Sequence, residues 1–169
     1  MKIRLLCMVA AVALLGACAE EKKAETSTTA PMKPAEAPPK VEPPKAPMGP
    51  VPGSEADFVA SVGDKVFFDF DKAALTADGK AQLAKWSDFL KKYPTDQLLV
   101  EGHCDERGTQ EYNLALGDKR ATAVKDFLVA QGVAASRVKT ISYGKERPWM
   151  PEHTEEAWAK NRRGVGVIQ

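Results

Sequence analysis

Residues 100–121, VEGHCDERGTQEYNLALGDKRA, run from a predicted strand through a charged loop into a predicted helix. The strand covers residues 98–102, a mainly apolar run. The helix is expected from about residue 111 to residue 131, because its apolar side chains recur at helical spacing and Gly132 can serve as the C′ residue. Residues 138–143 have the composition of another strand. A strand, a helix and a strand in this order predict a βαβ crossover with at least partly parallel pairing.

The flanking segments continue this alternation of strands and helices. A strand is predicted over residues 66–70, and a helix follows from the N-cap Thr76 to about Lys92, before Pro94. A short helix around residues 155–162 precedes a final strand over residues 164–168. The domain is therefore expected to be of the α+β class, with a small mixed sheet and helices packed on one face.

The loop in the opening segment brings together a thiol, an imidazole, two carboxylates and a guanidinium, and a metal site is the first alternative. His103, Cys104 and Asp105 are consecutive, so their side chains point to alternating sides wherever the chain is extended. The sequence has no CxxC or HxxxH pattern, and the other histidine, His153, lies in a proline-containing loop. Zinc sites need three or four convergent nitrogen or sulfur ligands. The sequence therefore predicts neither a metal nor any other cofactor here.

A Cys–His nucleophile is the second alternative. Such a pair needs the two groups within hydrogen-bond reach, usually from different elements, whereas His103 and Cys104 are neighbours in the chain. Cys104 is more typical of a small apolar residue at the end of a strand. The chain is accordingly predicted not to be an enzyme.

Recognition of a charged ligand is the third alternative. The loop leads into the N-terminal end of a helix, where free backbone N–H groups favour an anionic group. Asp105 in the loop and Arg120 in the helix would suit a zwitterion, with an ammonium group at Asp105 and a carboxylate held by the two-pronged guanidinium. The two side chains would equally suit a direct ion pair that fastens the loop to the helix. Charge chemistry alone leaves both possibilities open.

The start of the chain has the pattern of a bacterial export signal. Two basic residues precede an apolar run over residues 5–15, which is much shorter than the roughly 20 residues of a membrane-spanning helix. The run ends in LGAC at residues 15–18, which resembles a lipoprotein lipobox. Residues 1–17 are therefore predicted to be a signal peptide and Cys18 to be lipidated. Ala19 implies, by the same resemblance, sorting to the outer membrane of a Gram-negative bacterium, with the domain in the periplasm.

The segment that follows is rich in proline. Nine of the twelve prolines lie between residues 19 and 52, and the first aromatic residue is Phe58. Such a composition cannot bury enough apolar surface to offset the entropy of ordering, so residues 18–57 are predicted to form a disordered tether that begins with the lipidated cysteine. Residues 58–169 are expected to form one domain. The net charge of +1 argues against nucleic acid as a partner.

Four motifs, in the order VFFDFDK, VEGHCDERGTQEYNLALGDKRA, ISYGKERP and NRRG, resemble the OmpA C-terminal-like family. The resemblance covers about residue 58 to the C-terminus. It implies a βαβαβ fold followed by a helix and a strand, and non-covalent binding of peptidoglycan through the diaminopimelate residue of its stem peptide. With a lipid anchor in the outer membrane, such a domain would tether that membrane to the cell wall.

The resemblance also implies roles for individual residues of the binding cleft. The family aspartate that meets the diaminopimelate ammonium falls on Asp105, and the arginine that meets its carboxylate falls on Arg120. Four more residues are expected to line the same cleft: Asn113, Leu116, Phe68 and Asp69. For Asn113 a helix cap without ligand contact remains open, and for Phe68 an ordinary place in the core.

Glu106 and Arg107 are expected, by resemblance, on a surface shared with periplasmic Tol proteins of the TolB-like and TolA-like kinds. The Tol system implies a role in envelope integrity and cell division. An alternative is a structural envelope lipoprotein whose main target is a periplasmic protein partner.

Overall fold

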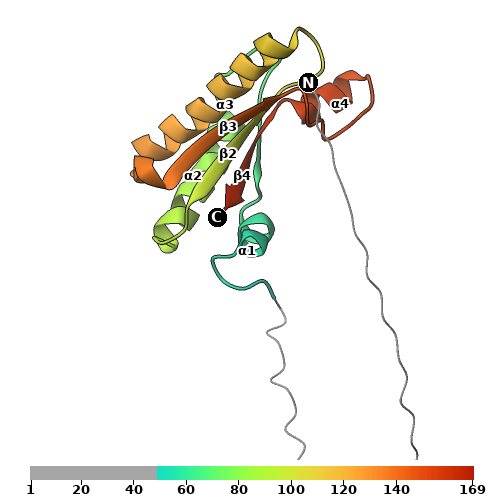
Figure 1. Ribbon diagram of the computed structural model, residues 1–169. Coiled ribbons are helices and arrows are strands. Elements are labelled where there is room, and N and C mark those ends of the chain that lie inside the picture. Colours follow the sequence, from blue (N-terminus) through green and yellow to red (C-terminus); the bar gives the residue numbers. More distant parts are fainter. Residues whose placement is uncertain (1–48) are drawn as a thin grey trace, which may run out of the picture. The chain divides into compact units, whose positions relative to one another are not determined.

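The computed structural model describes residues 49–169 (Figure 1). The predicted signal peptide, Cys18 and most of the predicted tether lie outside these residues. The described elements are, in chain order, α1 (Glu55–Ser61), β1 (Lys65–Phe67), α2 (Ala77–Lys92), β2 (Leu98–His103), α3 (Gln110–Ala130), the 3-10 helix η1 (Ala135–Arg137), β3 (Val138–Gly144), α4 (Glu155–Asn161) and β4 (Arg163–Ile168).

The four strands form one mixed sheet in the order β1-β4-β2-β3. β2 and β3 are parallel, and α3 makes the crossover between them. β4 lies between β1 and β2 and is antiparallel to both. The last strand is therefore inserted at the centre of the sheet, and the predicted α+β fold with a mixed sheet is confirmed.

The two long helices cover the same face of this sheet. Gly102 of β2 lies against Gly117 of α3, and Gly166 of β4 lies against Trp86 of α2. Gly166 pairs with Val100, which is two residues from Gly102, so both glycines present the same face. The prediction of helices packed on one face is therefore confirmed.

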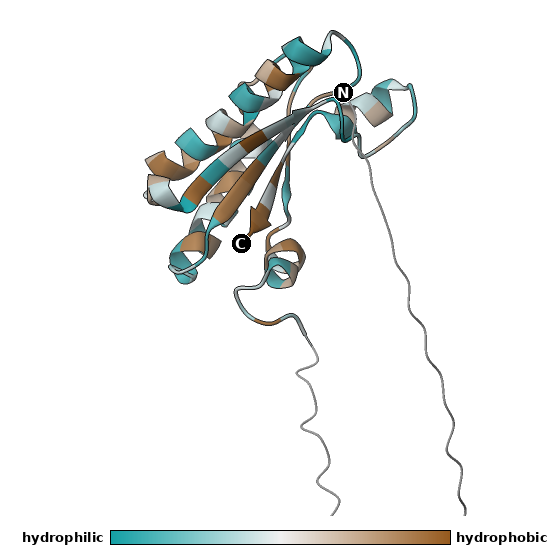
Figure 2. Ribbon diagram, in the orientation of Figure 1, coloured by the Kyte–Doolittle hydropathy of each residue, from teal (hydrophilic) through white to brown (hydrophobic). Residues whose placement is uncertain are grey.

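The hydrophobic core fills the space between this face and the helices. Phe58 of α1 makes edge-on contacts with the rings of Trp86 and Phe89, 5.3 Å and 5.1 Å between ring centroids. Hydrophobic and hydrophilic residues alternate along α3 in Figure 2, as expected of a helix with one side against a sheet. Leu98, Val100, Val124 and Leu128 are among the side chains that are fully buried.

Each of the four α-helices within residues 49–169 begins after a Ser or Thr whose hydroxyl accepts a backbone N–H of the first turn. These residues are Ser54, Thr76, Thr109 and Thr154, of which Thr76 is the predicted N-cap. Gly132 follows α3 with φ of +96°, as predicted for its C′ residue. No helix in this part of the chain is long and apolar enough to cross a membrane.

Two features differ from the prediction. The predicted strand over residues 66–70 ends at Phe67, and Asp71 takes a left-handed φ of +57° beyond it. Helix α1 was not predicted, because it has seven residues and buries only Phe58. The predicted domain boundary at residue 58 therefore falls inside a helix, and the folded part of the chain begins earlier.

The close approach of β2 to α3 gives a test of the fold. A Cβ added at Gly102 would lie 1.9 Å from the carbonyl oxygen of Gly117, so the helix would have to move. We expect Gly102→Ala to reduce the free energy of unfolding by about 3 kcal/mol or more, measured by urea denaturation. Gly164→Ala is the matched control, because a Cβ there meets its nearest neighbours at an ordinary 3.5 Å. Equal losses in the two variants would contradict this packing.

Candidate functional site

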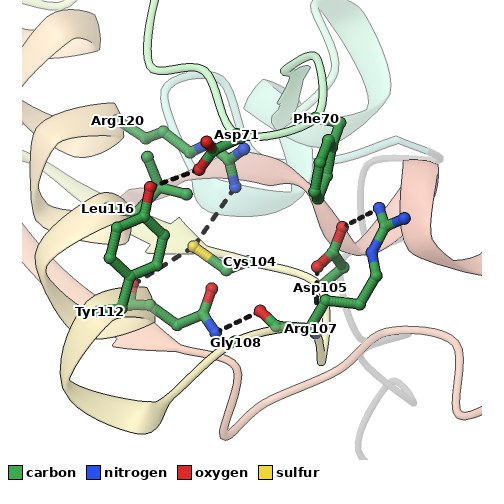
Figure 3. Close-up of a pocket in the computed structure, with 10 residues that line it drawn as sticks. Phe70, Asp71, Cys104, Asp105, Arg107, Gly108, Tyr112, Leu116 and Arg120 are labelled. Carbon is green, nitrogen blue, oxygen red and sulfur yellow. Dashed lines mark hydrogen bonds and ion pairs between the residues drawn. The ribbon is translucent and has the colours of Figure 1, made fainter.

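A cavity of about 240 Å³ lies where the β1–α2 loop, the β2–α3 loop and the first turns of α3 meet (Figure 3). It is smaller than the roughly 300–1,000 Å³ of sites for drug-sized ligands, and its size suits the end of an amino-acid side chain. Its lining residues are Phe70, Asp71, Cys104, Asp105, Arg107, Gly108, Tyr112, Asn113, Leu116 and Arg120.

Local hydrogen bonds set the shape of the β2–α3 loop. The Asp105 side chain accepts the backbone N–H of Arg107 at 3.2 Å, which closes a turn. Gly108 follows with φ of +94°, a conformation that side-chain-bearing residues rarely adopt. Lys145 of the β3–α4 loop donates to the Gly108 carbonyl at 2.7 Å. Thr109 then caps α3, so the loop delivers its charged side chains directly to the start of the helix.

Arg120 is 1% exposed and holds the floor of the cavity. Its guanidinium has five N–H groups. Four of them donate within the described part of the chain, to the carbonyls of Lys72, His103 and Asp69 and to the sulfur of Cys104, at 2.9, 2.9, 3.1 and 3.3 Å. Burial lowers the pKa of Arg120, but a guanidinium remains a cation under ordinary conditions.

This arrangement decides one of the alternatives left open by the sequence. The alternative of a direct ion pair between Asp105 and Arg120 is not found, because Arg120 donates to carbonyls and to sulfur instead. The expected two-pronged grip on a carboxylate is also limited, because only one N–H of Arg120 is left over. The bond to Cys104 is the one most easily replaced, since a thiol sulfur is a weak acceptor.

Asp105 is 4% exposed and takes its partners from arginines other than Arg120. Its Oδ2 atom lies 2.6 Å from Nη2 of Arg107 and 3.3 Å from Nη1 of Arg162. Burial by itself would raise the pKa of Asp105, but the hydrogen bonds from Arg107 and Arg162 outweigh it and leave the pKa below its usual value. The carboxylate is therefore ionised at neutral pH.

Cys104 lies between these two charged groups. Its thiol donates to the carbonyl of Asn113 and accepts from Arg120, both at 3.3 Å. Burial raises the pKa of the Cys104 thiol, which opposes the thiolate that a nucleophile needs. Within residues 49–169 no group of three or more His, Cys, Asp or Glu side chains is placed to hold a metal ion.

Asn113 and Leu116 both line the cavity, as expected. Asn113 is buried and donates to the carbonyls of Arg107 and Thr109 at 2.8 and 3.1 Å. It therefore fastens the loop to α3, while the capping role that was left open for it belongs to Thr109.

Phe68 and Asp69 were expected to line the cavity, but they do not. The phenylalanine and the aspartate that line it are two residues further along the chain. Phe68 is buried in the core, with its ring 5.2 Å below the guanidinium of Arg120, so the open alternative of a core residue is correct. Asp69 turns its exposed side chain to Lys72 and to a separate groove beside β1, and only its carbonyl reaches Arg120. Phe70 and Asp71 line the cavity instead, because the chain turns after β1.

Four residues of the site were not predicted from the sequence: Phe70, Asp71, Tyr112 and Arg162. Tyr112 donates a hydrogen bond to Asp71 across the mouth of the cavity, which joins α3 to the β1–α2 loop (Figure 3). The alternation of aromatic and acidic residues in FFDFDK was the available signal for Phe70 and Asp71. The NRRG motif was noted, but nothing in it showed that Arg162 reaches Asp105.

Glu106 and Arg107 both contact α4, and Arg107 also lines the cavity. Glu106 accepts hydrogen bonds from the ring nitrogens of His153 and Trp158 at 2.6 and 2.8 Å. The guanidinium of Arg107 lies between the rings of Phe70 and Trp158, 4.0 and 4.2 Å from their centroids. Both residues are therefore engaged within the domain, although each remains partly open to solvent.

Comparisons with known proteins match this chain to a described family. Residues 67–162 match the model of the OmpA family. Over 117 residues the chain is 52% identical to a peptidoglycan-associated lipoprotein of Agrobacterium fabrum, which covers 69% of this chain and 66% of that protein. It is 51% identical to the protein of the same name from Mesorhizobium japonicum, over 69% of this chain and 70% of the relative.

Two solved structures have a similar fold. The crystal structure of the peptidoglycan-associated lipoprotein from Burkholderia pseudomallei superposes with a TM-score of 0.61 at 43% identity, covering 63% of this chain and 90% of that one. The C-terminal domain of Helicobacter pylori MotB superposes with a TM-score of 0.59 at 23% identity, over 63% of this chain and 84% of that one. The second likeness concerns the fold alone.

His103 lies beside the cavity and carries a buried imidazole. It is 2% exposed, and its ring packs 5.6 Å from that of Tyr143. Burial, and then the positive charge of Arg163, lower the pKa of His103 from 6.5 to about 4. Although Glu101 lies 3.5 Å from the ring, these two effects prevail and the imidazole stays neutral at neutral pH.

This shift makes stability depend on pH. In the unfolded chain His103 binds a proton near pH 6.5, whereas the folded protein resists protonation until about pH 4. Stability from this group is complete above pH 6.5 and falls as pH drops toward 4, by about 2 kcal/mol at about pH 5. The free energy of unfolding, measured with urea, should therefore be lower at about pH 5 than at about pH 7.5. We expect His103→Gln to remove the part of this difference that His103 contributes. An unchanged difference would contradict the assignment to His103.

Proposed function

The chain belongs to the OmpA family, and from this premise we propose that its cavity binds the diaminopimelate residue of a peptidoglycan stem peptide. One observation carries the proposal. Asp105 and Arg120, a buried anion and a buried cation, line the same small cavity without pairing with each other. A cavity with two opposite, separate charges suits the ammonium and carboxylate groups at the free end of diaminopimelate.

The carboxylate of the ligand would bind at Arg120. One N–H is left over there, and the bond to the Cys104 sulfur can be given up for a stronger acceptor. The three backbone carbonyls would continue to hold the guanidinium in place. Because Arg120 is buried, its interaction with a carboxylate would be screened less than at the surface.

The ammonium group of the ligand would bind at Asp105, which remains ionised at neutral pH. Leu116, Phe70 and the ring of Tyr112 offer apolar surface between the charged groups and the mouth of the cavity. The methylene chain of diaminopimelate would pack there. A stem peptide with lysine in this position keeps the ammonium group but lacks the carboxylate, so the cavity would discriminate against it.

We infer further that the chain is a lipoprotein, as the names of its relatives state for those proteins. Residues 1–17 would be removed as a signal peptide, and Cys18 would carry the lipid. Two or more acyl chains anchor a protein stably in a membrane. The tether would run from Cys18 to about residue 53, and the domain that holds the wall would begin at the N-cap Ser54. Many anchored copies near the wall would hold it although each contact is weak.

The outer membrane of a Gram-negative bacterium is the proposed location, with the domain in the periplasm. The proposed protein partners are TolB-like and TolA-like proteins. They would bind a surface of this domain that includes Glu106 and Arg107. These residues adjoin the cavity, so such a partner would lie close to the bound wall. A role in envelope integrity and cell division would follow from a link between membrane and wall that a partner can adjust.

We propose a binding protein and not an enzyme. Burial raises the pKa of the Cys104 thiol and outweighs the opposite effect of Arg120, so this thiol is not activated as a nucleophile would be. A binding role also fits the name that the relatives carry, which states association with peptidoglycan.

The proposal predicts that binding depends on both charged residues. We expect Asp105→Asn and Arg120→Ala each to weaken binding of a diaminopimelate stem peptide by at least about thirtyfold, measured by calorimetric titration of the purified protein. Arg137→Ala is the matched control, because Arg137 also donates to three backbone carbonyls but lies away from the cavity. This variant should lose stability and keep the affinity of the wild type.

A lysine-type stem peptide is the matched ligand, and it should bind much more weakly to the wild type. Undiminished binding in Asp105→Asn and Arg120→Ala would place the site elsewhere on the domain. No binding by the wild type to either the peptide or protein-free cell wall would overturn the proposal. A periplasmic protein would then be the main target.

A further inference from the structure

The carboxylate of Asp105 is already occupied in the structure. Its Oδ1 accepts the backbone N–H of Arg107, and its Oδ2 lies within hydrogen-bond distance of both Arg107 and Arg162. A carboxylate accepts about four hydrogen bonds, and three are present. A further cation at this carboxylate would also meet two guanidinium groups. An ammonium group can therefore bind Asp105 well only if one of the arginines withdraws.

Arg162 is the fixed partner of the two. Its side chain is 8% exposed, its Nε donates to the carbonyl of Phe68 at 3.2 Å, and its Nη2 lies 2.9 Å from Glu155. Removing it from Asp105 would disturb its contacts with Phe68, directly after β1, and with α4. This arginine belongs to the framework of the site.

Arg107 is held differently. Its side chain is 32% exposed and lines the cavity, and its guanidinium lies between the rings of Phe70 and Trp158. Its Nη1 atom is already 3.4 Å from the exposed carboxylate of Glu155. A small movement of the guanidinium along the rings of Phe70 and Trp158 would break its ion pair with Asp105 and strengthen the one with Glu155. Arg107 thus has a second acceptor within reach, on the side away from the cavity.

We propose that Arg107 is an internal competitor that occupies the ammonium subsite of the empty cavity and moves to Glu155 when a ligand brings its own ammonium group. This inference rests on the proposed function, because it concerns the same cavity. The exchange keeps two cationic partners on the buried carboxylate throughout, which avoids leaving that charge unpaired. It also links ligand binding to α4, which carries Glu155 and Trp158.

Internal competition predicts an effect that depends on the ammonium group of the ligand. Arg107→Ala frees the subsite, so the diaminopimelate stem peptide should bind about tenfold more tightly than to the wild type. A stem peptide with 2-aminopimelate keeps the terminal carboxylate and lacks the ammonium group. Its affinity should change by less than about twofold, because it has nothing to exchange for Arg107. Glu155→Gln removes the negative charge of the second acceptor and should weaken binding of the diaminopimelate peptide alone.

Arg147→Ala is the matched control for Arg107→Ala. It removes the same charge and a similar contact with an aromatic ring, 3.7 Å from the centroid of Tyr143, and does not line the cavity. Its affinity should equal that of the wild type. Calorimetric titration of the four proteins with both peptides distinguishes the outcomes. Weaker or unchanged binding of the diaminopimelate peptide to Arg107→Ala, beside a wild type that binds, would overturn the competition and leave the proposed function intact. No binding to any of the four would overturn both.

Discussion

One buried guanidinium, that of Arg120, joins the three segments that form the cavity. It extends from α3 to the carbonyls of Lys72 and Asp69 in the β1–α2 loop and to that of His103 at the end of β2. A buried charge is costly unless it is well hydrogen-bonded, and these acceptors meet that need. Because no acidic side chain within residues 49–169 neutralises Arg120 directly, its charge remains available to a ligand.

The opposite charge of the cavity is kept apart by the loop that carries it. Asp105 folds back on the backbone of its own turn and takes its counter-ions from Arg107 and Arg162. The two buried charges therefore do not cancel each other. Apart from the movement of Arg107, a cavity prepared in this way has little ordering to undergo when a zwitterion binds, which favours affinity from a small contact area.

Much of this structure follows from the sequence, because its signals are local. Helical spacing predicts α2 and α3, and charge chemistry singles out Asp105 and Arg120. The missed features depend on contacts between distant parts of the chain. The chain leaves the strand after Phe67, and Phe70, not Phe68, then lines the cavity. Contacts of Arg120 with carbonyls about 50 residues away in the chain have no signature in side-chain patterns.

The most direct test of the central claim is a crystal structure of this protein with a diaminopimelate stem peptide bound. We expect the free carboxylate of the ligand on the Nη atoms of Arg120 and its ammonium group on Asp105, with the three carbonyl contacts of Arg120 unchanged. A peptide bound in the separate groove beside β1, with the cavity empty, would contradict it.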